Sequence, residues 1–223
     1  ILKNGRIIAA VAEERFSRKK HDNSFPKNAI EFCLNYAGIA ANEINMVAFY
    51  EKPIVKFERV LSTHLQHFPK SVNVFTQSMG SWLNEKLQIK KLMQNEIKYH
   101  GEIKYVPHHL SHAASSYYLS NFKRSAIVTL DGVGEWATTT VGFGSGKNIK
   151  IGKEIRFPHS LGLFYSTITS YLGFRVNNSE YKVMGLAAYG NPKRFARKFD
   201  ELITLYEDGS FSLNMKYFDF TWS

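Results

Sequence analysis

Three histidines and an aspartate are the residues of this chain whose types and spacing best suit metal chemistry. His108, His109 and His112 lie within the stretch VPHHLSHAASSYY, and Asp131 follows in TLDGVGEW. His108 and His112 are four positions apart, so on a helix they project from one face about one turn apart. Two neutral imidazoles and a carboxylate from a neighbouring strand suit a first-row transition metal with an open coordination position. His108, His112 and Asp131 are therefore a candidate metal site.

A simpler interpretation of the histidines competes with this one. Histidines near a helix start often cap the helix or hydrogen-bond to the backbone, and pairs four residues apart also arise by accident. Asp131 favours the metal interpretation, because it ends the apolar strand SAIVTL, where an open α/β sheet presents its ligand-binding edge. His109 projects elsewhere on the helix and is expected to do something different from its neighbours.

The composition is that of a globular protein. The chain has 223 residues, of which 44% are hydrophobic and 22% charged, enough for a substantial core and one or two lobes. No apolar run approaches the roughly 20 residues that cross a bilayer, and no signal peptide opens the chain. The single cysteine, Cys33, excludes an intramolecular disulfide and suits a reducing compartment, so we expect a cytoplasmic protein without a membrane partner.

The formal charge of +10 and the pI near 9.5 raise the hypothesis of a nucleic-acid partner. The basic residues are dispersed in short groups, however, and no aromatic-and-basic recognition module interleaves with them. This distribution favours anionic small ligands and solvated surface over nucleic acid. One group follows a predicted strand and is a candidate anion-binding cluster: Arg15, Lys19, Lys20 and His21. The same cluster could equally be solvated surface.

Alternating patterns and turn residues predict a mixed α/β fold. Strands are expected at 7–16, 44–50 and 103–106, and the turn signal at Asn4-Gly5 suggests a hairpin whose preceding strand lies upstream. Helices are expected from Pro26 to Ala37, closed by Gly38, and at 55–67, 79–99 and 108–119. A new unit begins at Ser125 with three glycine-linked strands, followed by helices at 161–172 and 192–205 with a small-residue helix between them. Repetition of strands and helices predicts two α/β lobes with a ligand cleft between them.

Two glycine-containing segments could bind phosphate. Gly132, Gly134 and Glu135 join two strands, where glycines let backbone N–H groups approach a phosphate or adenylate closely. Glu180, Lys182 and Gly185 form a second segment, in which the lysine could neutralise a phosphate or an oxyanion. The alternatives are an ordinary hairpin and a surface lysine beside a packed helix. The motifs of P-loop nucleotide binding, dinucleotide binding and the serine nucleophile elbow do not occur in the sequence.

Together the segments resemble the NodU/CmcH family of O-carbamoyltransferases. The resemblance covers nearly all of the chain and follows the order of five motifs: AAVAEERFSRKKHDNSFPKNAIEFCL, VPHHLSHAASSYYLS, IVTLDGVGEWATTT, FPHSLGLFYSTITSYLGF and EYKVMGLAAYGNP. It implies an ASKHA fold, the superfold of acetate and sugar kinases, heat-shock proteins and actin. Residues 1–122 would form a first lobe without its first strand, and residues 123–223 the start of a second lobe.

The resemblance also implies a two-stage reaction. A YrdC-like domain of the same full-length chain would make carbamoyl adenylate from carbamoyl phosphate and ATP. The ASKHA-like domain would then pass the carbamoyl group to a hydroxyl of a small-molecule acceptor, using a divalent metal of the Fe(II) type. His108, His112 and Asp131 match the family's metal ligands, a further aspartate ligand would lie beyond Ser223, and the fragment alone would be inactive.

Several roles stay open from the sequence. His109, beside the ligand pair, is a candidate base for the acceptor hydroxyl. A tRNA threonylcarbamoyl-transfer-like protein would share the chemistry and explain the positive charge, whereas an ASKHA-fold kinase or ATPase would give no role to the histidine pair. The acceptor, the metal and the oligomeric state, with a homodimer as one option, cannot be read from the sequence.

Overall fold

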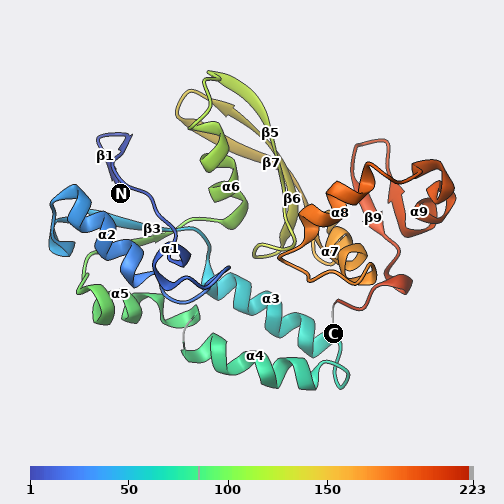
Figure 1. Cartoon of the computed structure of the whole chain (residues 1–223), viewed down its shortest axis with the longest axis horizontal. Coiled ribbons are helices and arrows are strands. Elements are labelled where there is room, and N and C mark those ends of the chain that lie inside the picture. Colours follow the sequence, from blue (N-terminus) through green and yellow to red (C-terminus); the bar gives the residue numbers. More distant parts are fainter. Residues whose placement is uncertain (85, 221–223) are drawn as a thin grey trace. The chain divides into compact units, whose positions relative to one another are not determined.

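The structure is a computed structural model that describes residues 1–84 and 86–220 (Figure 1). It divides into two compact units: unit 1 comprises Ile1–Phe49 and Met79–Tyr105, and unit 2 comprises Tyr50–Ser78 and Val106–Ser223. The division into ASKHA lobes at residues 1–122 and 123–223 stays a prediction. The mixed α/β class is confirmed, and the assignment to the ASKHA superfold stays a prediction.

Unit 1 contains a hairpin, a parallel strand pair and helices that cover one small core. Its strands are β1 (Leu2–Lys3), β2 (Arg6–Ile7), β3 (Met46–Phe49) and β4 (Glu102–Tyr105), and its helices include α1 (Glu14–Ser17), α2 (Lys27–Ala37), η1 (Ala41–Glu43), η2 (Lys86–Gln88) and α5 (Ile89–Ile97). The strands β3 and β4 pair in parallel with Val47 opposite Ile103. Buried Met93, Ile97 and Tyr99 form the core with these two strand residues packed against them.

Helix α2 confirms the sequence prediction at both ends. It begins after Pro26 and ends at Gly38, which adopts the left-handed conformation at φ 65° and donates its backbone N–H to Asn35. A residue with a side chain is disfavoured in that conformation, so glycine suits this stop.

The predicted strand 7–16 is wrong beyond Ile7. The chain leaves β2 at that residue, runs without regular structure and forms the short helix α1. Glu13 gives the physical reason, because its side chain is turned inward and buried. Its carboxylate accepts hydrogen bonds from the backbone N–H groups of Asn28 (3.3 Å) and Ala29 (2.8 Å), and so caps the N-terminus of α2.

Unit 2 is built on a three-stranded antiparallel sheet against which helix α6 packs (Figure 1). The strands are β5 (Arg124–Leu130), β6 (Ala137–Ser145) and β7 (Asn148–Arg156), and the helix is α6 (His108–Tyr117). All three predicted strands are confirmed. Ala113, Tyr117 and Ile127 form the buried contact between α6 and the sheet. This packing fixes the face of α6 that looks at the sheet and therefore the direction of each histidine.

The remaining helices and strands of unit 2 are α3 (Pro53–Gln66), α7 (Leu161–Tyr171), α8 (Glu180–Ala187), η3 (Pro192–Arg194), α9 (Ala196–Leu202), β8 (Ile203–Leu205), β9 (Phe211–Leu213) and η4 (Met215–Tyr217). The helix predicted at 192–205 ends early, because Ile203–Leu205 pairs with Phe211–Leu213 as a hairpin. The helix predicted at 79–99 is interrupted: α4 (Val72–Asn84) belongs in part to each unit, and α5 starts only at Ile89. Within the described residues, no helix has both the length and the apolar character needed to cross a membrane.

The cap on α2 generates a stability prediction. Glu13→Ala removes the acceptor of two backbone N–H groups and should lower the free energy of unfolding by about 1–3 kcal/mol, measured by urea denaturation. Glu31→Ala is the matched control, since Glu31 is an exposed carboxylate of the same helix. Equal losses in both variants would contradict the capping role.

Candidate metal centre

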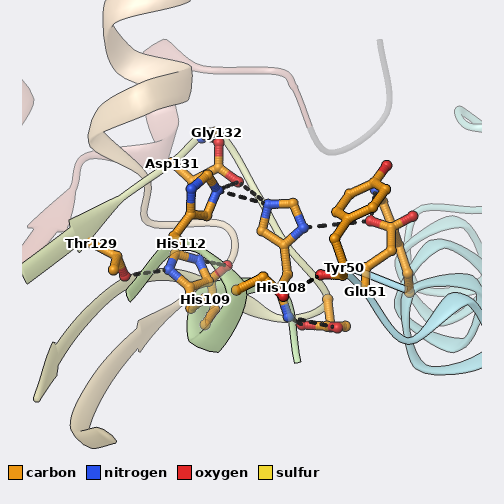
Figure 2. Close-up of polar contacts among 12 residues, drawn as sticks. Tyr50, Glu51, His108, His109, His112, Thr129, Asp131 and Gly132 are labelled. Atoms are coloured by element: carbon orange, nitrogen blue, oxygen red, sulfur yellow. Dashed lines mark hydrogen bonds and ion pairs between the residues drawn. The ribbon is translucent and has the colours of Figure 1, made fainter. Parts of the chain in front are cut away.

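The first two turns of α6 present two of its three histidines to one side and the third to the sheet. His108 is the first residue of the helix, after Pro107, and the ring centroids of His108 and His112 are 4.7 Å apart. Figure 2 shows these two rings meeting the carboxylate of Asp131, while His109 turns toward Thr129. The spacing of four residues thus places the rings of His108 and His112 on one side of the helix, as the sequence predicted.

Three potential ligand atoms converge at this point. His108 Nε2 lies 2.8 Å from Asp131 Oδ2 and 3.0 Å from His112 Nε2, and the remaining edge, from His112 Nε2 to Asp131 Oδ2, is 3.7 Å. Metal–ligand bonds of about 2.0–2.2 Å place neighbouring ligand atoms roughly 3.0–3.5 Å apart. The triangle formed by His108 Nε2, His112 Nε2 and Asp131 Oδ2 therefore has the size of one face of a coordination polyhedron. These three donor atoms fit a divalent cation.

The carboxylate of Asp131 is aimed by the loop that follows β5. The backbone N–H of Gly132 donates to Asp131 Oδ1 at 2.7 Å, which leaves Oδ2 facing the histidines. Ser160 caps α7 and donates its hydroxyl to the carbonyl oxygen of Gly132 at 2.6 Å. Gly162 fits so closely that an added Cβ would lie 2.5 Å from the Asp131 carbonyl. Helix α7 therefore packs directly on the loop that orients the ligand.

The electrostatics of the triangle favour positive charge. The hydrogen bond to Asp131 raises the pKa of His108 to about 9, with the Glu51 carboxylate adding to the effect. The same hydrogen bond to His108 lowers the pKa of Asp131 to about 2. A proton on His108 Nε2 thus holds the cluster together without metal, and a divalent cation would have to displace that proton.

His109 lies inside the unit with both ring nitrogens engaged. Its Nε2 donates to the carbonyl oxygen of Ala137 at 2.8 Å, so its Nδ1 accepts from Thr129 Oγ1 at 2.6 Å. Thr129 in turn lies 2.7 Å from Thr140 Oγ1, and burial lowers the pKa of His109. This arrangement leaves no free ring nitrogen on His109 for the proton transfer predicted from the sequence, and it gives the residue a role in joining α6 to the sheet.

Glu135, predicted to bind a nucleotide, is engaged by backbone groups. Both carboxylate oxygens lie 3.0 Å from the backbone nitrogen of His108, and Oε1 also accepts from the backbone N–H of Lys52 at 2.9 Å. Lys52 precedes α3, so one carboxylate serves the N-termini of α3 and α6. Gly134 lies under the His108 ring, where an added Cβ would meet the His108 Cβ at 3.0 Å. The Gly132–Glu135 loop thus shapes the surroundings of His108.

The second predicted segment stays apart from the triangle. Glu180 accepts from the backbone N–H of Asn177 at 2.7 Å, a local contact at the start of α8. Lys182 is exposed, Gly185 faces open space, and α8 has no buried residue. The contacts of the triangle in the described part of the chain do not include these three residues.

The predicted anion-binding cluster lies in unit 1 and does not contribute to the triangle. Arg15, Lys19, Lys20 and His21 are exposed at and after α1, and the backbone N–H of His21 donates to Glu14 at 2.9 Å. Their role as an anion-binding cluster stays a prediction.

Two pairs of residues around the triangle were not predicted from the sequence. Glu51 and Lys56 come from the segment before and within α3, and form an ion pair of 2.6 Å next to His108. Ser160 and Gly162 come from the start of α7. The motif FPHSLGLFY contained the second pair, whereas nothing in the spacing of Glu51 pointed to a histidine far along the chain.

The fold and the converging side chains define the class of protein: a mixed α/β protein with a candidate centre of two histidines and one carboxylate. Comparison with known families is consistent across the chain, because the sequence profile described as "Carbamoyltransferase N-terminus" matches residues 1–223. The chain therefore belongs to the carbamoyltransferase N-terminus family.

Individual relatives agree with this family. The chain is 47% identical to the uncharacterized protein sll1178 of Synechocystis sp., over 99% of this chain and 37% of that protein. It is 35% identical to the nodulation protein NolNO of Sinorhizobium fredii, over 96% of this chain and 30% of that protein. A shorter match, 37% identical over 48% of this chain, is to the nodulation protein NolO of Bradyrhizobium diazoefficiens. The chain spans about a third of the length of the first two relatives.

The close approach at Gly162 generates a second prediction. Gly162→Ala places a methyl group against the Asp131 backbone, so it should lower the free energy of unfolding by about 1–3 kcal/mol and weaken metal binding by displacing the carboxylate. Urea denaturation and metal titration measure the two effects. Gly185→Ala is the control, because its added Cβ meets open space within a helix. Unchanged metal affinity in Gly162→Ala would contradict the positioning role of α7.

The shifted pKa values predict how the metal-free protein responds to pH. His108 has a folded-state pKa of about 9 against 6.5, so its stabilising contribution is complete below pH 6.5 and is lost as pH rises to 9. The pKa of Asp131, about 2 against 3.8, adds a second loss as pH falls below 3.8. After metal ions are removed with a chelator, urea denaturation should give a lower free energy of unfolding at about pH 9.5 than at about pH 6. His108→Gln should flatten most of this difference; an unchanged slope would contradict the assignment.

Proposed function

We propose that this chain is the transfer part of a carbamoyltransferase that passes a carbamoyl group from carbamoyl adenylate to a hydroxyl of a small-molecule acceptor. The observation that carries the proposal is the convergence of His108, His112 and Asp131 in a member of a carbamoyltransferase family. The family gives the group that is transferred, and the triangle gives a place where its carbonyl oxygen can be polarised.

A divalent cation fits the three side chains, and Fe(II) is our first expectation. Two histidines and one carboxylate on one face of a metal, with the other positions open, are typical of non-haem Fe(II) sites. Side-chain exposure supports an open face, since it rises from 13% at His108 to 29% at Asp131 and 47% at His112. When bound, the cation would supply Lewis-acid polarisation of the carbamoyl carbonyl.

The chain's own residues would hold and orient the reacting groups. Gly132 keeps one oxygen of Asp131 occupied, so that only Oδ2 faces the centre. His108 and His112 present Nε2 atoms from consecutive turns of a helix packed on the sheet, which limits their movement during the reaction. In the transfer, the acceptor oxygen bonds to the carbamoyl carbon, the bond from that carbon to the adenylate phosphate breaks, AMP leaves, and the hydroxyl proton passes to water.

The whole reaction needs more than this chain. We propose that a YrdC-like domain of the full-length protein makes the carbamoyl adenylate from carbamoyl phosphate and ATP, and that the present chain folds as part of an ASKHA-type domain. The relatives support a longer protein, since 37% and 30% of their lengths match this chain.

Two related functions make different predictions. A threonylcarbamoyl-transfer-like protein would bind tRNA with a steep salt dependence, because phosphate contacts release counterions. Titrating tRNA at two salt concentrations therefore separates it from a small-molecule carbamoyltransferase. A kinase or ATPase of the same superfold would keep its activity when the histidine pair is removed.

The central experiment uses the full-length natural protein that contains this segment. His108→Ala and His112→Ala should each lower carbamoyl transfer at least about 100-fold, since the polarising centre supplies several kcal/mol of transition-state stabilisation. Formation of carbamoyl adenylate should continue. His100→Ala is the matched control, because His100 is an exposed histidine outside the centre. Retained transfer in both variants would refute the role of the centre.

A further inference from the structure

A buried charged group lies on the side of His108 that faces away from the triangle. Glu51 is 6% exposed, and its carboxylate is 2.6 Å from the ammonium group of Lys56 and 3.5 Å from His108 Nδ1. Arg59, 7% exposed, adds a second buried cation whose charge acts on Glu51. Neither family membership nor the predicted ligand set assigns these residues a task.

His108 therefore stands between two carboxylates that meet opposite edges of its ring. Figure 2 shows Nε2 directed at Asp131 and His112, and Nδ1 directed at Glu51. The Nδ1 atom is buried and lacks a hydrogen bond of good geometry, so the nearby Glu51 carboxylate is the acceptor placed to receive its proton. A histidine that binds a cation through Nε2 carries its remaining proton on Nδ1.

Hydrogen bonds to the backbone hold the segment of Glu51 beside α6. Ser111 donates its hydroxyl to the carbonyl oxygen of Tyr50 at 2.9 Å, on the residue before Glu51. Glu135 accepts from the backbone N–H groups of both Lys52, on the residue after Glu51, and His108. The segment that presents Glu51 is thus attached on both sides to the helix that presents His108, so the distance between the two side chains is fixed by the fold.

We propose that Glu51, held by Lys56, is the positioning carboxylate of His108: it accepts a hydrogen bond from the Nδ1–H group and so directs the Nε2 lone pair into the triangle. This inference rests on the proposed metal-dependent function. Carboxylates that accept the second N–H of a metal-binding histidine fix its tautomer and ring orientation and raise its basicity. Glu51 acts through His108 and does not itself reach the reacting groups.

A purely structural role for Glu51 makes different predictions. As half of a buried ion pair with Lys56, it would affect folding stability, and its loss would leave Lys56 uncompensated. It would not accept a hydrogen bond from His108 Nδ1 or change the affinity of the centre for metal. The hydrogen bond of the Nδ1 proton and the affinity for metal are therefore the measurements that separate positioning from simple stabilisation.

The experiment compares three variants of the full-length protein. Glu51→Gln keeps the shape and removes the charge, and the double variant Glu51→Leu with Lys56→Met removes both partners of the ion pair, so that the Lys56 ammonium group is not left uncompensated. Glu58→Gln is the matched control, because Glu58 is an exposed carboxylate of α3, the helix that also carries Lys56. Circular dichroism and urea denaturation verify that each variant folds.

Two readouts decide the outcome. With Co(II) as the probe, competition against a chelator should give affinities about 10–100-fold weaker in both Glu51 variants and unchanged in Glu58→Gln. In the protein loaded with diamagnetic Zn(II), whose ion occupies Nε2, NMR should find the His108 Nδ1 proton shifted downfield and exchanging slowly with water, as a hydrogen bond to Glu51 requires. The double variant should lose this signal.

The failure of this inference differs from that of the proposed function. If the unaltered protein binds Co(II) and the folded Glu51 variants bind it equally well, Glu51 has no positioning role and the metal function stands. If the unaltered protein binds no Co(II), the metal function fails, and the inference that rests on it fails with it.

Discussion

The imidazole of His108, placed between the carboxylates of Asp131 and Glu51, is the contact on which the rest of the centre depends. Two negative groups at opposite edges of one ring favour positive charge there, whether as a proton or as a cation beyond Nε2. Because both carboxylates are partly or largely shielded from water, this preference is stronger than it would be at the surface. The same contact that stabilises the fold therefore directs His108 Nε2 toward Asp131 and His112.

The surrounding structure fixes the three groups by backbone contacts more than by side-chain packing. Glu135 joins the starts of α3 and α6, and Ser160 with Gly162 holds the loop of Asp131 against α7. His109 and Thr129 attach α6 to the sheet from the other side. Each of the three side chains comes from an element that is anchored at the point where the side chain projects, as a functional site needs for its geometry to survive substrate binding.

Local patterns predicted the regular elements well wherever one periodicity dominated. Proline and glycine at its ends marked α2, and glycine turns marked the three strands of unit 2. The strand predicted at 7–16 is wrong because the buried Glu13 caps a helix that starts 14 residues later. The helix predicted at 192–205 ends early because Ile203–Leu205 pairs with another strand. In both places a contact with a separate segment outweighed local propensity.

The sequence by itself determined that His108 and His112 share a face, because residues four apart on a helix do so whatever surrounds them, and it indicated Asp131 through its place at a strand end. Only the tertiary structure decided that His109 hydrogen-bonds to the sheet and that Glu135 caps the N-termini of two helices. It alone also placed Glu51 beside His108. Those roles depend on which segments distant in sequence lie together. That juxtaposition follows from packing α6 on the sheet and α3 beside its first turn, which no spacing along the chain encodes.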